Sequence, residues 1–139
     1  MSGSERFPED GCGVVALAAI ERFERAGTYV VAVVGEIDLS NVGAVEGAAR
    51  GASNQALGVV LDLSATAYID SATVGMLFRL RGSLRRRGQA LRVVCARGSS
   101  AGRVLELTGF SRRLAPEESR DAAIAAIHAE VEGSALDSH

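Results

Sequence analysis

The chain of 139 residues is poor in the side chains that zinc and phosphate-loop sites need. It has two cysteines and no lysine, so that all 15 cationic side chains are arginines. Cys12 and Cys95 lie far apart and outside any Cys-x-x-Cys or Cys/His spacing, which argues against a zinc site or a redox motif. The stretch ARGSSAG (96–102) lacks the lysine of a P-loop. Neither a metal site nor a nucleotide-phosphate loop is therefore indicated.

Histidine is equally scarce, and this bears on catalysis. A serine hydrolase would need a histidine base beside a serine such as Ser71, with Asp38 or Asp70 to orient it. The chain offers only His128, inside the last expected helix, and His139, at the final position. A triad is hard to assemble from these residues. We therefore expect no enzymatic activity and no cofactor of the chain's own.

Long apolar runs and a strong charge of one sign are also missing. The run Val14–Ile20 is far too short to span a bilayer. The formal net charge of −2 gives no strong field that would attract nucleic acid or an anionic membrane. The first residues, MSGSERFPEDGCG, show no basic region followed by an apolar one, so no signal peptide is expected. These features favour a cytoplasmic protein that is not associated with a membrane.

The pattern along the chain predicts one α/β domain at residues 13–132, with flexible tails at residues 1–12 and 133–139. Apolar, β-branched runs alternate with amphipathic stretches, which implies βαβ crossovers and a mixed, mostly parallel sheet of four to five strands packed with about four helices. Turn or cap residues are expected at Ala26-Gly27, at Asp38 or Ser40, and at Ser99 or Ser100. The expected strands are 14–24, 28–35, 56–64 and 89–96, with one more possible near Arg113–Ala115.

The segment LDLSATAYIDSATVGMLFRL (61–80) passes from a buried strand through small polar residues into a helix that ends at Arg87-Gly88. Advancing about 100° per residue places one apolar stripe inward. Ser71 lies on the opposite side, together with two glycines and the aromatic ring of Phe78, an arrangement that suits a partner's surface. The inward stripe consists of Thr73, Met76, Leu77, Leu80 and Leu84, and the outward face of Ser71, Gly75, Phe78, Gly82 and Arg86.

Three motifs resemble the signature blocks of STAS domains, and specifically of the bacterial anti-sigma-factor antagonists. They are VVAVVGEIDLSN (30–41), VVLDLSATAYIDSATVGML (59–77) and RVLELTGF (103–110), of which the D-L-S-x-x-x-x-I-D-S block is the most specific. The resemblance covers about Val14 to Ile127, with the blocks in the family's order and spacing. It implies a STAS fold and a role in controlling a sigma factor through protein binding.

The family resemblance also implies which residues act. The serine of the Asp-Ser pair, here Ser71 after Asp70, is the one that an anti-sigma factor with kinase activity phosphorylates. The unphosphorylated antagonist binds that kinase and frees the sigma factor, the phosphorylated one is released, and a phosphatase resets it. ATP belongs to the kinase. Asp38 matches an acidic residue near the serine, while Thr73 stands where the family commonly has glycine. The expected partner-binding residues are Asp38, Asp70, Ser71, Ala72, Gly75 and Phe78.

Other interpretations stay open at this level. Ser71 can be an ordinary helix N-cap, and Thr73 or Ser64 would be the next candidates for phosphorylation. The domain can be a scaffold that binds without being switched, or a sensor that holds a small anion or nucleotide at a helix N-terminus, near Ser71 or near Ser100. An arginine-rich stretch could contact nucleic acid, although arginines also favour a helix C-terminus. Its members are Arg79, Arg81, Arg85, Arg86, Arg87 and Arg92.

Overall fold

The computed structural model describes residues 12–15, 18–110 and 115–137. Within these residues the chain forms a single sheet of six strands and four helices, which confirms the predicted α/β class. The strands are β1 (Cys12–Val15), β2 (Ala18–Arg25), β3 (Thr28–Ile37), β4 (Gly58–Asp62), β5 (Thr66–Ile69) and β6 (Ala90–Val94); the helices are α1 (Val42–Arg50), α2 (Ser71–Arg86), α3 (Ser100–Leu107) and α5 (Arg120–Asp137).

The sheet is mixed, as predicted. β1, β2 and β3 pair antiparallel, whereas β3 with β4, β3 with β5, and β4 with β6 are parallel. β4 and β5 share one edge of β3, since β4 pairs with residues 28–32 and β5 with residues 35–37. Sequence reasoning did not anticipate β5, because it has only four residues, of which the two at its ends are buried and the two in its middle face solvent. It also interpreted residues 14–24 as one strand, where the structure has parts of β1 and β2.

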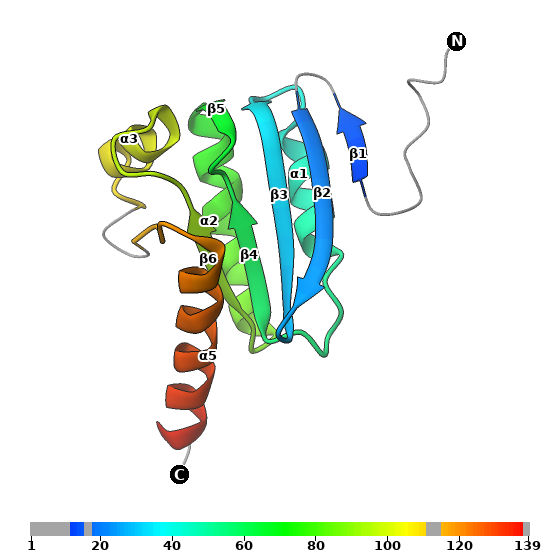
Figure 1. Cartoon of the computed structure of the whole chain (residues 1–139), viewed down its shortest axis with the longest axis vertical. Coiled ribbons are helices and arrows are strands. Elements are labelled where there is room, and N and C mark those ends of the chain that lie inside the picture. The colour runs from blue at the N-terminus through cyan, green and yellow to red at the C-terminus, as the bar shows by residue number, and fades with distance from the viewer. Residues whose placement is uncertain (1–11, 16–17, 111–114, 138–139) are drawn as a thin grey trace.

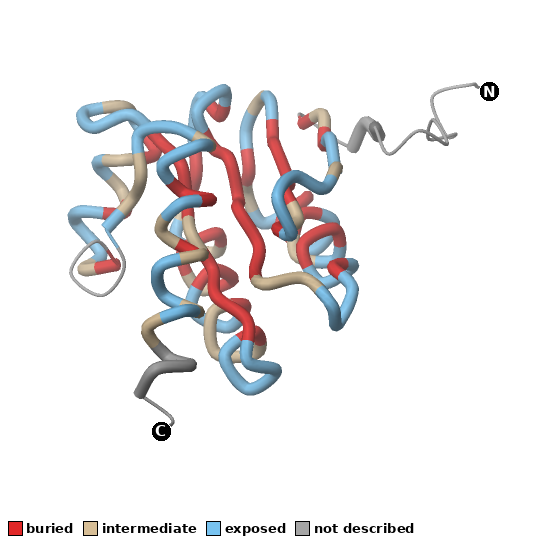
Figure 2. The backbone as a smooth tube through the Cα atoms, turned by 60° about the horizontal axis from the view of Figure 1, so that its bottom comes forward, coloured by how far each residue is buried: buried red, intermediate tan, exposed pale blue. Residues whose placement is uncertain are grey.

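Helices cover the two faces of the sheet unequally (Figure 1). α1 and α2 pack on one face and enclose the larger core, to which β3, β4 and β6 contribute alternate residues. α5 packs on the other face over β4 and β6, where Val30, Val60 and Ile127 are fully buried. All five residues of β4 are buried, as expected for a central strand covered on both faces. The buried strands run through the middle of the molecule (Figure 2).

Turns and caps explain where the elements begin and end. Ala26 and Gly27 have φ angles of 53° and 79° and form the predicted turn between β2 and β3. Gly88 follows α2 with φ 75°, as predicted for the residue after a helix C-cap. Ser99 caps α3 by accepting a hydrogen bond from Gly102 N. The cap expected for α1 was wrong: its N-cap is Asn41, which makes no side-chain capping bond, rather than Asp38 or Ser40.

The ends of the domain differ in part from the predicted tails. β1 starts at Cys12, and α5 continues through residues 133–137, which were expected to belong to the C-terminal tail. The rest of both tails, residues 1–11 and 138–139, lies outside the described residues. So does most of the strand considered near Arg113–Ala115, although Glu117 forms a single parallel bridge with Val94. In the described parts of the chain, no helix is both long and apolar enough to cross a membrane.

Candidate functional site

Ser71 is the first residue of α2 and is exposed to solvent. The N-cap is the residue before it: Asp70 is extended, with φ −113° and ψ −176°, and its carboxylate accepts a hydrogen bond from Thr73 N. The interpretation of Ser71 as the N-cap is therefore wrong. Its hydroxyl makes no hydrogen bond within the described residues, so a side chain at this position is free to react.

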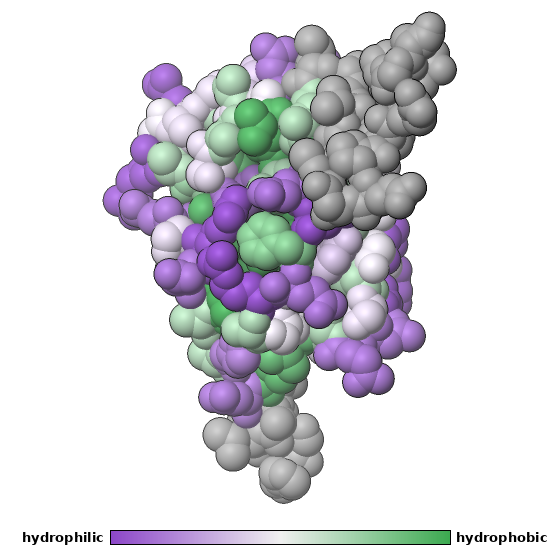
Figure 3. Space-filling model, turned by 45° about the vertical axis from the view of Figure 1, so that its right-hand side comes forward, coloured by the Kyte–Doolittle hydropathy of each residue, from purple (hydrophilic) through white to green (hydrophobic). Residues whose placement is uncertain are grey.

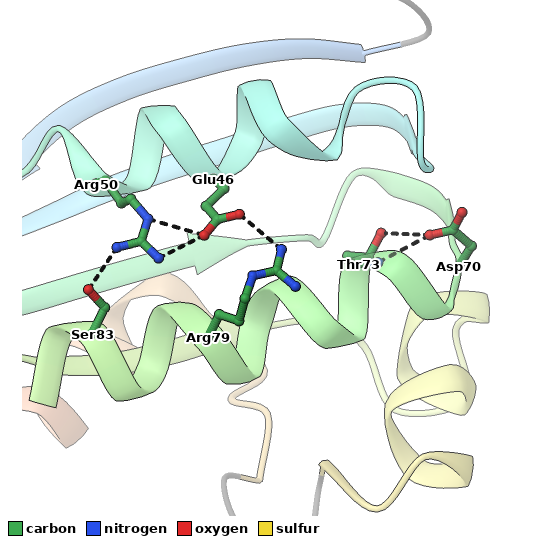
Figure 4. A network of polar contacts seen from close by, with 6 residues as sticks. All are labelled: Glu46, Arg50, Asp70, Thr73, Arg79 and Ser83. Carbon is green, nitrogen blue, oxygen red and sulfur yellow. Dashed lines mark hydrogen bonds and ion pairs between the residues drawn. The ribbon is translucent and has the colours of Figure 1, made fainter.

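The Asp70 carboxylate holds two segments at once. Its Oδ1 accepts from Thr73 N at 3.1 Å and lies 3.2 Å from Thr73 Oγ1, within the first turn of α2 (Figure 4). Its Oδ2 accepts from Leu39 N at 3.1 Å, in the loop after β3. Thr73 is fully buried, as the helical periodicity predicted, and its Oγ1 also lies 3.3 Å from Ile37 O. A carboxylate at this position thus joins the end of β3 to the start of α2.

The loop that follows β3 contains Asp38 and is held by its own side chains. Asp38 Oδ1 accepts from Ser40 N at 2.9 Å and from Ser40 Oγ at 2.5 Å. Asn41, which is almost fully buried, accepts from Asp38 N at 3.0 Å and donates to Glu36 O at 2.9 Å. The hydrogen bonds from Ser40 lower the pKa of Asp38. The structure therefore brings Asp38 to the Ser71 end of the sheet, and the link between the two runs through Leu39 and Asp70.

The orientation predicted for α2 is confirmed. The residues assigned to its inward stripe, Thr73, Met76, Leu77, Leu80 and Leu84, are all buried, and Val74, which the prediction did not place, is buried too. Ser71 and Phe78 are exposed, and Ala72 and Gly75 are partly exposed. The sequence-based site residues on α2 consequently share one solvent-facing surface.

Phe78 is less free than the sequence suggested. Phe78 is 36% exposed, but its ring packs edge to face on the ring of Phe110. The two centroids lie 5.1 Å apart, and the interplanar angle is 68°. Phe110 is fully buried and belongs to the core of the α1 and α2 face. Phe78 is thus both part of the outer surface and a cover for a core residue, because its loss would open Phe110 to water.

A network of charged side chains joins α1 to α2 beside this surface (Figure 4). Glu46 on α1 accepts from Arg50 at 2.7 Å and from Arg79 on α2 at 3.1 Å, and Arg50 also donates to Ser83 Oγ at 2.7 Å. Burial raises the pKa of Glu46, but the hydrogen bonds from the two arginines outweigh it, so the pKa lies below its ordinary value. The network fixes the relative position of the two helices.

Two of the arginines in the arginine-rich stretch are paired with carboxylates. Arg79 is paired with Glu46, and Arg92 lies on β6, where it contacts Glu117 at 3.7 Å and Glu130 at 2.7 Å. Arg87 donates to Asn54 and to Ala52 O. The carboxylates compensate the charges of Arg79 and Arg92, so these two side chains attract phosphates only weakly, whereas the partners of Arg87 are neutral. These contacts weigh against the nucleic-acid interpretation.

The histidine of α5 lies at the wrong end of the sheet to serve Ser71. His128 Nε2 is 2.7 Å from Ala26 O, in the turn that precedes β3, whereas the loop linked to Asp70 follows β3. A strand of ten residues separates the two ends by about 30 Å at the usual rise of about 3.3 Å per residue. His128 can therefore not act as a base for Ser71.

Two further predictions concern metals and small ligands. In the described part of the chain, no group of three or more metal-ligating side chains comes together. Cys95 is buried, and burial raises the pKa of its thiol, which makes it less reactive. A small pocket of about 150 Å³ lies at the start of α3, and its lining includes Cys95, Arg97, Gly98, Gly102, Glu106 and Glu118. Its lining carries two carboxylates and one arginine, a composition that does not favour an anion.

Sequence reasoning missed Leu39 and the dual role of Asp70. Leu39 is 78% exposed and stands on the loop next to the Ser71 end of α2. Helical or strand periodicity carries no information on a loop residue. The Asp-x-Ser spacing of residues 38–40 is a signal for a local hydrogen-bonded turn, which could have identified the loop but not its contact with Asp70.

Comparisons with known proteins place these residues in a family context. A family model described as the STAS domain matches residues 19–123. An anti-sigma factor antagonist from Mycobacterium paratuberculosis is 27% identical, with a TM-score of 0.72 over 80% of this chain and 94% of that chain. No curated protein matches the chain.

More distant structures share the fold alone. A sulfate transporter family protein from Wolinella succinogenes is 18% identical, with a TM-score of 0.63 over 79% of this chain and 92% of that chain. The phosphorylated form of SpoIIAA, a Bacillus cell fate determinant, is 14% identical, with a TM-score of 0.59 over 78% of this chain and 98% of that chain. The same fold thus occurs in proteins with different roles.

Proposed function

The chain belongs to the STAS domain family, and on this basis we propose that it is an anti-sigma-factor antagonist controlled by phosphorylation of Ser71. In its unphosphorylated form it binds an anti-sigma factor that is also a serine kinase, and this binding frees a sigma factor. Phosphorylation of Ser71 releases the kinase, and a phosphatase restores the binding form. The similarity to the mycobacterial antagonist supports this role over that of a transporter domain.

The observation that carries the proposal is that the Ser71 side chain is exposed and its hydroxyl is not used in the fold. It is exposed, it opens a helix, and its hydroxyl is not used for capping because Asp70 supplies the cap. By contrast, Thr73 is buried, so a kinase could not reach its hydroxyl without unfolding the first turn of α2. Ser64 is exposed but lies in the loop between β4 and β5 rather than on α2. Ser71 is therefore the best phosphoacceptor among the three candidates.

A phosphate on Ser71 acts on the partner more than on the fold. It adds about −1.5 to −2 charges at a helix N-terminus, where the helix dipole favours negative charge. The surface around it is already acidic, with Asp70 as its neighbour and Asp38 in the adjacent loop. A partner that fits closely over Ser71, Ala72, Gly75 and Phe78 would have to strip water from a dianion. Release then follows without a large conformational change.

The proposal assigns the chemistry to the partners. ATP and phosphoryl transfer belong to the kinase, and hydrolysis of the phosphoserine belongs to the phosphatase. The chain itself contributes a binding surface and one hydroxyl group and acts in the cytoplasm, where sigma factors bind RNA polymerase.

The decisive experiment is capture of partners from a lysate of the source cells, followed by mapping of phosphorylated residues. We expect an ATP-dependent serine kinase to bind the wild-type protein and to place phosphate on Ser71. Ser71→Ala should bind that kinase and incorporate no phosphate, whereas Ser71→Glu should keep its fold and lose affinity. Undiminished labelling of Ser71→Ala would move the acceptor to another residue.

Ser71→Glu also distinguishes the phosphorylation-controlled antagonist from a STAS scaffold that is not switched. A STAS scaffold that binds without being switched would hold its partner equally well with Ser71→Glu. The Ala variant is the matched control, because it removes the hydroxyl at the same position without adding charge.

A further inference from the structure

Leu39 is an exposed leucine on a loop that has little freedom to move. Among the described large apolar side chains, only Leu107, at 87%, is more exposed than Leu39, at 78%. Single exposed leucines are common on protein surfaces and need no explanation in themselves. What distinguishes Leu39 is the number of hydrogen bonds that hold the residues around it.

These hydrogen bonds fix the loop from both sides. Asp38 binds both the amide and the hydroxyl of Ser40, and Asn41 binds Asp38 N and Glu36 O. The amide of Leu39 itself donates to Asp70 Oδ2 at 3.1 Å. The loop is thus ordered before any partner arrives, which lowers the entropy lost on binding.

We infer that Leu39 is an apolar anchor for the same partner that docks at Ser71, and that Asp70 is the positioning residue that fixes it there. The inference rests on the proposed function, because its occupant is the kinase that phosphorylates Ser71. Nothing in the sequence pattern assigned Leu39 a role. The partner would need an apolar pocket beside its active site to receive the leucine.

The shared carboxylate is the reason for assigning one partner to both residues. Asp70 immediately precedes Ser71, and one of its oxygens contacts the Leu39 amide while the other caps α2. A surface large enough to bring a kinase active site onto Ser71 would also cover Leu39. Buried apolar anchors at the centre of an interface contribute more affinity than the contacts around them.

The positioning role can be tested on the isolated full-length chain by amide hydrogen exchange measured by NMR. Asp70→Asn supplies a residue that caps a helix as well as aspartate, but it has one acceptor oxygen for two amides. We expect the Leu39 amide to exchange at least about tenfold faster than in the wild type, while that of Thr73 stays within about twofold. Unchanged exchange at both amides would overturn the positioning role.

The anchor role needs the kinase recovered in the capture experiment, titrated with purified variants. Leu39→Ser should weaken binding by about 10- to 30-fold, whereas Leu39→Met, which keeps an apolar side chain, should stay within about threefold. Leu107→Ser is the matched control, because it removes a leucine on α3 that is even more exposed than Leu39, and it should change binding by less than about twofold. Equal weakening by Leu39→Ser and Leu107→Ser would overturn the assignment of Leu39.

A double-variant comparison links the two roles. If Asp70 acts through Leu39, then Asp70→Asn should add little to the loss caused by Leu39→Ser, so that the two effects are not additive. Full additivity would show that Asp70 acts independently of the leucine and would overturn the link.

Failure of the inference is distinct from failure of the proposed function. If Leu39→Ser binds like the wild type while Ser71→Glu releases the kinase, then the anchor is wrong and the switch stands. If Ser71→Glu still binds the kinase but Leu39→Ser does not, then the surface is right and the switch is wrong. Recovery of no kinase would overturn both.

Discussion

At the scale of single residues, the structure separates two roles that adjacent positions could have shared. Asp70 caps α2 and holds the loop after β3, whereas Ser71 contributes its hydroxyl to neither. Under the proposed function the side chain of Ser71 is modified and restored repeatedly, and such a residue is better kept out of the structural contacts. Because of this division, we expect a change of the Ser71 side chain to affect the stability of the fold little.

This division gives a prediction for stability. Ser71→Ala should change the free energy of unfolding by less than about 0.5 kcal/mol, because Ser71 is exposed and its hydroxyl makes no hydrogen bond to the described residues. Asp70→Ala should cost about 0.5–2 kcal/mol, since it removes the N-cap. Urea denaturation of both variants measures the difference. A larger loss for Ser71→Ala than for Asp70→Ala would contradict the assignment of the cap.

Phe78 gives a second prediction at this scale. Because its ring packs on Phe110, Phe78→Ala should cost about 1–2 kcal/mol of stability, since an aromatic pair contributes about 0.5–1.5 kcal/mol beyond the area that it buries. Leu80→Ala, which leaves a cavity in the core, should cost about 2–5 kcal/mol. Thermal melts compare the two. A larger loss of stability for Phe78→Ala than for Leu80→Ala would mean that Phe78 is the more deeply packed residue and would contradict the prediction.

At the scale of elements, the turn between β2 and β3 contains a residue in an unfavourable conformation. Ala26 has φ 53°. For residues other than glycine and asparagine, the left-handed region costs about 1–2 kcal/mol of conformational free energy. Asn-Gly is the preferred pair in two-residue hairpin turns with two positive φ angles. Ala26→Asn should therefore stabilise the protein by up to about 1 kcal/mol, and Gly27→Ala, with φ 79°, should destabilise it. Differential scanning calorimetry would show the two shifts in opposite directions.

Elements also differ in how far the sequence predicts them. β3 and β4 follow from their apolar, β-branched runs, and α2 follows from its periodicity and from Gly88. β5 could not be predicted in the same way, because it owes its place to pairing with the end of β3 across an irregularity in register. Within the site, Ser71 and Phe78 follow from periodicity and resemblance. The contact between Leu39 and Asp70 joins residues 31 positions apart, and no local pattern encodes it.

At the scale of the whole molecule, an ion pair holds the N-terminus of α5 to the end of β4. Arg120 pairs with Asp62, which is almost fully buried, and the guanidinium groups of Arg120 and Arg25 lie 5.2 and 5.4 Å from the centre of the Phe23 ring. On the side of the molecule that carries β2, apolar surface is enclosed by hydrophilic surface (Figure 3). The final helix is thus attached to the sheet by charge as well as by its apolar stripe.

This attachment predicts how stability depends on pH. Burial raises the pKa of Asp62, but hydrogen bonds from Ser64 and the contact with Arg120 outweigh it, so the pKa lies below its ordinary value of 3.8. A lowered pKa in the folded state stabilises the protein above the ordinary value, and this contribution is lost as the pH falls through the folded-state pKa. Stability should therefore decline from about pH 4 downwards.

The matched variant is Asp62→Asn, which removes the titrating group. It should be less stable than the wild type at neutral pH, because Arg120 loses its counter-ion. The difference between the two proteins should shrink below pH 4. Urea denaturation across a range of pH measures it, and a difference that stays constant down to pH 2 would show that Asp62 does not titrate in the folded state.

The two-residue turn at Ala26-Gly27 also bears on the order in which the sheet assembles. Its antiparallel pair closes a very short loop, and hairpins of this kind form within about 1–10 μs. The parallel pairs of β3 with β4 and of β4 with β6 each have to wait for a crossover that includes α1 or α2, and longer loops close more slowly. We therefore expect the hairpin of β2 and β3 to form first, with the free edge of β3 as the template to which β4 and β5 add. Ala26→Asn would then accelerate folding and leave the unfolding rate almost unchanged.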